Sequence, residues 1–453
     1  MDARTAAVAA VLCLVPVFAL AGEAGDVESV SLTIYNNDLA LIREVRPFDL
    51  DAGVQNLVLS EVSGKLKPQT VHLSLPSHIS VELLEQNYDY DLVSRDKLLE
   101  KFIGREIILS DDERSISYKG TLLSVSGGLV LDRDGEILLD PPGRIILPAD
   151  AADELLLKPT LSWMVYSPRA VKTSAEITYL SSGLSWSADY VVLLNADDTA
   201  GDIEAWVTLS NYSGTTYRDA RLKLIAGDVH RAPEYEKMRS EAMYVGARGG
   251  SVADGFEEEA FFEYHLYDLQ RPTTVKNNQQ KQIGLLTANG VPMEKIFLFN
   301  GQHGGDVRVM VEFANDEESG MGMPLPAGVV RVFKEDSDGD AQFVGEDRID
   351  HTPKDEDVRL YIGNAFDVVG EATQTEYTDI GKGYVNSYKV VLKNHKESDD
   401  VVVTVRIQVR GDWSISESSH PYEMKDAFTA EFTVPVKAGG EAELTYTYKL
   451  VWR

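Results

Sequence analysis

The feature that most constrains this fold is the alternation of hydrophobic and polar residues in short segments along almost the whole chain. These segments are separated by Asp-Gly, Gly-Gly and Asn-rich turns. Because successive side chains of a strand point to opposite faces, a period of two is typical of half-buried antiparallel strands. Only residues 95–103 have a clear helical pattern, with Ser94 as the expected N-cap and Gly104 as the stop. The pattern predicts an all-β protein with one short helix.

The lengths of these segments divide the chain into an N-terminal β domain and two larger units. The N-terminal domain covers residues 22–150, and five short segments within residues 104–148 have the spacing of a small SH3-like barrel. Longer segments follow and predict two immunoglobulin-like β-sandwich domains, over residues 151–320 and 321–453. Residues 232–259 contain Gly-Gly and a run of three glutamates, so we expect an inserted loop in the first sandwich.

A short internal similarity links the two predicted sandwiches. One strand ends at Asn211, and after a polar turn the next strand leads to Gly227. The same arrangement recurs where a strand ends at Asn394 and the following strand leads to Gly411. An aspartate follows each glycine. This similarity favours two related sandwiches.

The N-terminus has the features of a secretory signal peptide. An apolar stretch from Ala6 to Leu20 follows Arg4, and Ala19-Leu20-Ala21 has the small-x-small form of a cleavage site. We expect a signal peptide over residues 1–21, with a retained anchor as the alternative. The only cysteine, Cys13, lies within it, so the mature chain forms no disulfide and thiol catalysis is excluded. No later stretch has transmembrane length, and the lack of disulfides in an exported chain favours the bacterial periplasm over a eukaryotic secretory route.

The charge of the chain limits its partners. It has 43 Lys and Arg against 73 Asp and Glu, a net charge of −30. Such an excess of negative charge disfavours binding to nucleic acid or to an anionic membrane surface.

Several long motifs carry a family resemblance. They read YLSSGLSWSADYVVLLN (Tyr179–Asn195), EYHLYDLQRPTTV (Glu263–Val275) and RIDHTPKDEDVRLYIGNAFD (Arg348–Asp367), with further matches at residues 222–229, 345–347 and 394–413. Together they resemble the domain-of-unknown-function 4139 family of bacterial envelope proteins, over about residues 155–453. Mucoidy-inhibitor-A-like members carry this β-rich domain at the C-terminus, but their coiled-coil N-terminal part is absent here. The resemblance implies a β-rich envelope protein and supplies no catalytic residue.

Two groups of residues are candidates for a site. Tyr264, His265, Tyr267 and Arg271 lie along one predicted strand, where aromatic rings can bind a sugar or a peptide, with packing within the sheet as the favoured alternative. The second group combines carboxylates with an imidazole near a Thr-Pro turn. Its members are Glu346, Asp347, Asp350 and His351. A carboxylate beside an imidazole can form a general base, and a hydrogen-bonded corner between strands is the favoured alternative.

A third cluster resembles the start of a calcium loop. Asp336, Asp338 and Asp340 alternate, but Ala341 and Asp347 stand where a calcium loop needs Gly and Glu. We therefore expect an Asp-Gly hairpin turn, with a shallow calcium site as the alternative.

No catalytic, zinc-binding or phosphate-binding motif is complete, and the eight histidines are scattered. The sequence therefore favours an exported, non-enzymatic interaction or scaffold protein of the cell envelope, without a cofactor. Its expected partner is an envelope protein or polysaccharide. A periplasmic carbohydrate-active or metal-assisted hydrolase, using residues 346–351, is the alternative.

Overall fold

The computed structural model describes residues 22–89, 94–111, 116–148, 158–227, 256–261 and 264–452. The predicted signal peptide and nearly all of the predicted loop at residues 232–259 lie outside them. The described residues form strands almost throughout, with one α-helix, α1 (Arg95–Lys101), and one 3-10 turn, η1 (Pro68–Thr70). The all-β class and the short helix are therefore confirmed. None of the described helices is long and apolar enough to cross a bilayer.

The predicted cap begins helix α1, which ends two residues earlier than predicted. The Ser94 side chain accepts a hydrogen bond from the Lys97 N–H, as an N-cap does. Gly104 has a φ of +82°, and its N–H donates to the Leu122 carbonyl at 2.7 Å. The glycine thus turns the chain from the helix into the strands that follow.

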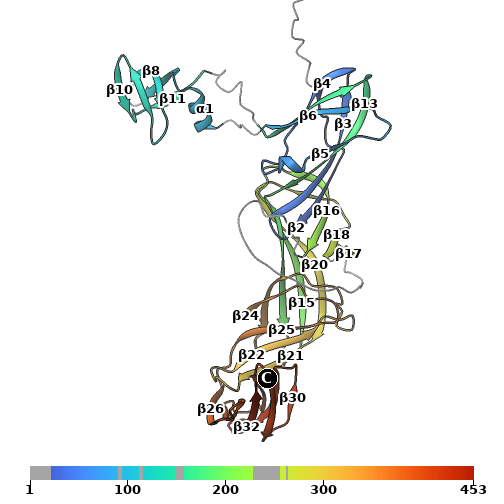
Figure 1. Ribbon diagram of the computed structural model, residues 1–453, viewed down its shortest axis with the longest axis vertical. Helices are drawn as coiled ribbons and strands as arrows, with labels where there is room; N and C mark the ends of the chain where they lie inside the picture. The colour runs from blue at the N-terminus through green and yellow to red at the C-terminus, as the bar shows by residue number, and fades with distance from the viewer. Residues whose placement is uncertain are drawn as a thin grey trace, which may run out of the picture.

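The strands form sheets that we number 1 to 6 (Figure 1). In order across each sheet, sheet 1 contains β1 (Gly22–Glu23), β4 (Gly53–Ser60), β12 (Thr160–Ser167) and β6 (Glu82–Asp89). Sheet 2 contains β17 (Phe256–Phe261), β18 (Tyr264–Leu269), β16 (Tyr217–Ala226), β2 (Ser29–Tyr35), β3 (Leu39–Leu50), β13 (Val171–Ser181) and β5 (His72–Ser74), and β19 (Thr273–Val275) also pairs with β16. Sheet 3 contains β10 (Glu136–Leu139), β9 (Val130–Arg133), β8 (Ile116–Ser124), β7 (Glu106–Asp111) and β11 (Arg144–Ile146).

The remaining sheets lie toward the C-terminal end of the molecule (Figure 1). Sheet 4 contains β20 (Gln279–Pro292), β15 (Ala200–Asn211), β14 (Leu184–Leu194), β23 (Gly328–Glu335) and β24 (Ala341–Ile349). Sheet 5 contains β25 (Asp357–Asn364), β22 (Arg308–Ala314), β21 (Glu294–Asn300), β28 (Val401–Gln408), β31 (Thr429–Val436) and β30 (Tyr422–Met424). Sheet 6 contains β26 (Val368–Asp379), β27 (Gly383–Asn394), β32 (Glu441–Val451) and β29 (Asp412–Ser418).

Hydrogen bonding crosses both predicted domain boundaries. Strand β3 pairs with β13, and β2 pairs in parallel with β16, so sheet 2 joins strands from both sides of residue 150. Likewise, β23 pairs in parallel with β14 and brings residues beyond 320 into sheet 4. Sheet 3 and α1 lie between β6 and β12 in the sequence, and those two strands are paired neighbours in sheet 1. Residues 94–148 are therefore an insertion in a hairpin, and the sheets do not divide at residues 150 and 320.

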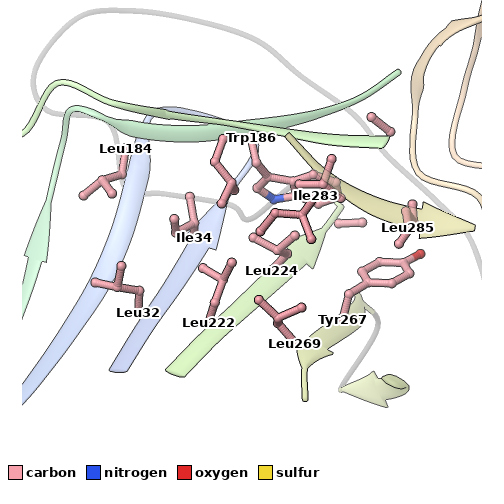
Figure 2. Packing of buried hydrophobic residues seen from close by; sticks show 14 of the residues in the cluster. Leu32, Ile34, Leu184, Trp186, Leu222, Leu224, Tyr267, Leu269, Ile283 and Leu285 are labelled. Atoms are coloured by element: carbon pink, nitrogen blue, oxygen red, sulfur yellow. The ribbon is translucent and has the colours of Figure 1, made fainter. Parts of the chain in front are cut away.

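Three hydrophobic clusters hold these sheets together. The largest joins sheets 1, 2 and 4 and continues to sheet 5. Figure 2 shows part of it, where side chains of β2 and β16 face those of β14 and β20. The labelled residues on these strands are Leu32, Ile34, Leu222, Leu224, Leu184, Trp186, Ile283 and Leu285. A second cluster lies between sheets 5 and 6, and a small third cluster lies between α1 and sheet 3.

Two sets of strands share one topology. The first set is β2, β3, β13, β14, β15, β16, β18 and β20, and the second is β21, β22, β25, β26, β27, β28, β31 and β32. In each set the first strand pairs antiparallel with the second strand and in parallel with the sixth. The second strand also pairs with the third, and the sixth strand also pairs with the seventh. The fourth, fifth and eighth strands form the opposing sheet. We name these sets the first and second sandwich.

The asparagines noted in the sequence occupy matching places in the two sandwiches. Asn211 and Asn394 are buried at the ends of the fifth strands. Each donates from Nδ2 to a carbonyl in the following turn, Thr215 at 2.9 Å and Asp399 at 2.8 Å. Each also donates to a distant strand, to the carbonyls of Val275 and Val436. The internal similarity of the sequence therefore has a structural basis.

Candidate functional site

Of the candidates on β18, Tyr267 lies in the core. Its side chain is only 1% exposed and points into the hydrophobic cluster (Figure 2). Its ring contacts Trp186 edge-on at 6.2 Å, and its hydroxyl donates to the Pro324 carbonyl at 2.9 Å. Burial raises the pKa of Tyr267 well above its ordinary value. Tyr267 therefore packs between sheets, which was the alternative interpretation.

The other three residues of this group have different surroundings. His265 Nδ1 lies 2.8 Å from Glu258 Oε1 on β17, a carboxylate that is 3% exposed. Tyr264 lies against Gly227, where an added Cβ would come within 2.6 Å of its ring. Arg271 is exposed beyond the end of β18. Because neighbouring residues of a strand face opposite sides, Tyr264 and His265 do not share a surface.

The candidates at residues 346–351 also have separate partners. Glu346 Oε2 lies 3.4 Å from Arg331 Nε, whereas Asp347 Oδ2 accepts from the Tyr361 N–H at 2.7 Å. The Asp350 carbonyl accepts from the Thr352 hydroxyl at 3.0 Å. His351 Nδ1 accepts from the Ala327 N–H at 3.1 Å. These contacts tie β24 and the residues after it to their neighbours, and Glu346, Asp347 and His351 each have a different partner in them.

The aspartate cluster is the hairpin turn between β23 and β24. Asp336 Oδ1 accepts from the N–H groups of Asp338 and Asp340, both at 3.0 Å, and Oδ2 accepts from the Gln342 side chain at 2.9 Å. These hydrogen bonds, led by that from Asp340, lower the pKa of the Asp336 carboxyl. The predicted turn is confirmed, since Asp336 organises it through backbone hydrogen bonds. Over the described ranges, no three His, Asp or Glu residues are grouped so that they could hold a metal.

A buried polar cluster, which the sequence did not indicate, joins sheets 1, 2 and 4. Ser63 Oγ lies 2.6 Å from Ser181 Oγ and donates to the Ser213 carbonyl at 3.0 Å. Nearby, Glu44 accepts from the Tyr179 hydroxyl at 3.1 Å, and burial raises the pKa of Tyr179 well above its ordinary value. All five side chains are at most 3% exposed, so these hydroxyls and this carboxylate satisfy one another inside the protein.

A cleft of about 600 Å³ lies between helix α1 and the loops of sheet 3. Leu99, Leu129 and Ile145 line it, together with Arg95 and Asp140. The Asp140 carboxylate accepts from the Leu129 N–H at 2.7 Å and so holds one loop in place. The cleft is open to solvent and most of its exposed lining is polar, since Asp96, Glu100 and Ser126 also line it.

A group of aromatic rings on sheet 6, which we name the tyrosine cluster, lies partly in the core and partly at the surface. Its members are Tyr377, Tyr384, Tyr388, Tyr446, Tyr448 and Trp452. Tyr388 and Tyr446 stack at 5.4 Å, as do Tyr377 and Tyr384 at 5.7 Å. The rings of the cluster therefore contact one another across three strands.

This cluster runs from the core to the solvent. Tyr446 and Tyr448 are 2% and 3% exposed, whereas Tyr377 on the edge strand β26 is 59% exposed and Trp452 is 54% exposed. Asn386 of β27 pairs with Tyr448 of β32 on one side and with Tyr377 of β26 on the other. Because directly paired residues point to the same face of a sheet, Tyr377 lies on the face that packs against sheet 5. Burial raises the pKa values of Tyr384 and Tyr388, so their hydroxyls stay neutral at physiological pH. The cluster offers aromatic faces and neutral hydroxyls to a ligand.

Sequence reasoning missed this surface because its rings come from segments far apart in the chain. Within each segment the tyrosines simply alternate with polar residues, as in any half-buried strand. Only the register of β26, β27 and β32 brings them together.

No family model matches the chain, and a search of curated proteins found no match.

Proposed function

We propose that this protein is an exported, non-enzymatic interaction or scaffold protein of the bacterial cell envelope. The exposed tyrosine cluster is the observation that carries the proposal. Exposed contiguous aromatic surface is uncommon on monomers, and tyrosine and tryptophan dominate the energetics of protein interfaces. With Tyr377 and Trp452 both more than half exposed, the cluster has the composition of a binding surface.

The arrangement of charged groups also supports binding rather than catalysis. Asp347, His351 and Asp336 are engaged in hydrogen bonds that hold strands and turns. A hydrolase needs its acid, base and substrate groups to meet at one place. Among the candidates, Asp347 and His351 accept from the backbone N–H groups of two different segments, at Tyr361 and Ala327.

The compartment and the family are parts of this proposal that rest on the sequence. The apolar segment before Ala21 favours export to the periplasm, and the motifs between residues 179 and 413 favour the domain-of-unknown-function 4139 family. A partner in this compartment is an envelope protein or a polysaccharide. The net charge of −30 favours a partner with cationic regions.

The proposal is tested by affinity purification of the tagged mature protein from the envelope of its own host. The double variant Tyr377→Ala/Trp452→Ala removes the exposed rings, and Tyr166→Ala, another exposed tyrosine on sheet 1, is the matched control. We expect a stoichiometric protein or glycan partner with the wild type and the control, and its loss with the double variant. Recovery of the same material with all three proteins, or of none at any salt concentration, would overturn the proposal.

A further inference from the structure

We propose that the edge strand β26 binds an extended segment of a partner protein as an added parallel strand. In this arrangement the apolar side chains of the segment lie on the tyrosine cluster and its Lys or Arg side chains lie on the outer face. The inference rests on the proposed function and specifies the partner's chemistry. It follows from comparing the fourth strands of the two sandwiches, β14 and β26.

The first sandwich shows such an addition within this chain. Strand β23 pairs in parallel with β14, from Gly328 opposite Ala188 to Lys334 opposite Leu194. Val330 and Val332 of β23 are buried. The added strand therefore completes the core at this edge.

The buried asparagines align β14 with β26. Asn211 pairs with Leu184, the first residue of β14, and Asn394 pairs with Val368, the first residue of β26. Counting from these pairs, Ala188 corresponds to Ala372, where the contact with β23 begins in the first sandwich. A bulge after Gln374 adds one residue to β26, so Leu194 corresponds to Asp379.

The aligned residues differ in exposure. On β14, the inward side chains Tyr190 and Val192 are at most 2% exposed, and the Tyr190 hydroxyl donates to the Pro326 carbonyl just before β23. Their counterparts on β26, Gln374 and Tyr377, are exposed. Over the described part of the chain, β26 pairs only with β27. The second sandwich thus leaves open the edge that the first sandwich covers.

Charge identifies the kind of segment that fits. On β23, Arg331 alternates with the buried Val330 and Val332 and so faces outward, and its Nη1 donates to Asp189 of β14 at 3.2 Å. The outward positions of β26 include Glu371 and Glu376, and the strand contains no Lys or Arg. Like charges on directly opposed strands repel, so two copies of β26 do not pair well. A segment that alternates apolar and basic residues matches both the aromatic face and the acidic face.

A synthetic peptide of residues 326–335, PAGVVRVFKE, is the probe, and its binding to the mature full-length chain is measured by calorimetry. We expect Tyr377→Ala to weaken binding at least about tenfold, because it removes an aromatic anchor. In this register Arg331 of the peptide lies opposite Glu376, so Glu376→Lys should abolish binding, and a peptide with Glu in place of Arg331 should restore it. The control is Leu83→Ala on β6, the edge strand of sheet 1, which should leave binding unchanged.

A distance measurement tests the parallel orientation. Residues 22–453 contain no cysteine, so Lys382→Cys, in the turn that follows β26, gives a single labelling site. A parallel segment places its C-terminal label near this site, and energy transfer should be higher from that end than from the N-terminal end. Higher transfer from the N-terminal end would overturn the parallel arrangement.

Two further outcomes overturn the inference. One is the absence of peptide binding up to about 1 mM, which corresponds to only about 4 kcal/mol of affinity. The other is binding that neither the Tyr377 variant nor the charge reversal changes. If the envelope purification still recovers a partner that depends on Tyr377 and Trp452, strand addition fails while the scaffold function stands.

Discussion

The first and second sandwiches share a strand order but differ in whether the fourth strand has a paired neighbour at the edge of its sheet. In the first, the β23–β24 hairpin covers β14, and the inward side chains of β14 are apolar and buried. In the second, β26 is the edge, and its C-terminal half is polar apart from Tyr377. The comparison teaches that the topology of a sandwich does not determine whether its edge is closed. A strand from elsewhere in the sequence, or from a partner, decides it.

The largest effect expected from this comparison comes from a charge placed at each edge. Val332→Asp buries a carboxylate where β23 meets β14, and it should lower the free energy of unfolding by about 4 kcal/mol. Tyr377→Asp changes an exposed position on β26 and should cost less than about 1 kcal/mol. Urea denaturation of both variants measures the difference. Equal losses would contradict the distinction between a closed and an open edge.

The two buried asparagines test whether the sandwiches are built alike. Asn211→Ala and Asn394→Ala each leave carbonyl groups of a turn and a strand without their donor, and each should cost about 2–3 kcal/mol. Asn56→Ala, at an exposed position of β4, is the control and should have little effect. The measurement is calorimetric unfolding. A large loss at one asparagine and none at the other would break the equivalence of the two sandwiches.

The smallest effect concerns the turn of the covering hairpin. The pKa of Asp336 is lower in the folded protein than in the unfolded chain, so its ionised form contributes stability above the unfolded pKa, about 3.9. That contribution is lost as the pH falls through the lower, folded pKa. Asp336→Asn should therefore reduce the dependence of hairpin stability on pH below about 4, as measured by hydrogen exchange. Asp338→Asn, in the same turn, is the control, and identical pH profiles for both variants would contradict the role of Asp336.

Local chemistry explains what the sequence could predict. All five strands of sheet 3 lie within residues 104–148, where five short segments were predicted, because Gly and Asp turns separate them. Ser94 caps α1 as expected, and Asp336 forms the turn expected from its Asp-Gly sequence. Each of these features depends on residues close together in the chain.

The features that could not be predicted depend on distant residues. The parallel pairings of β2 with β16 and of β14 with β23 join segments more than a hundred residues apart, so they crossed the predicted boundaries. The sequence also places Glu346 beside Asp347, but strand geometry directs them to opposite faces. The SH3-like and immunoglobulin-like descriptions stay predictions.

The pairing of β2 with β16 also has a consequence for the order of folding. Strand β2 lies near the N-terminus, yet its parallel partner ends at Ala226, and the opposing sheet needs β20, which ends at Pro292. Contacts of such long sequence separation form late, since the intervening chain must first be brought together. As the chain emerges vectorially, its first sandwich stays incomplete until well over half of the residues have appeared.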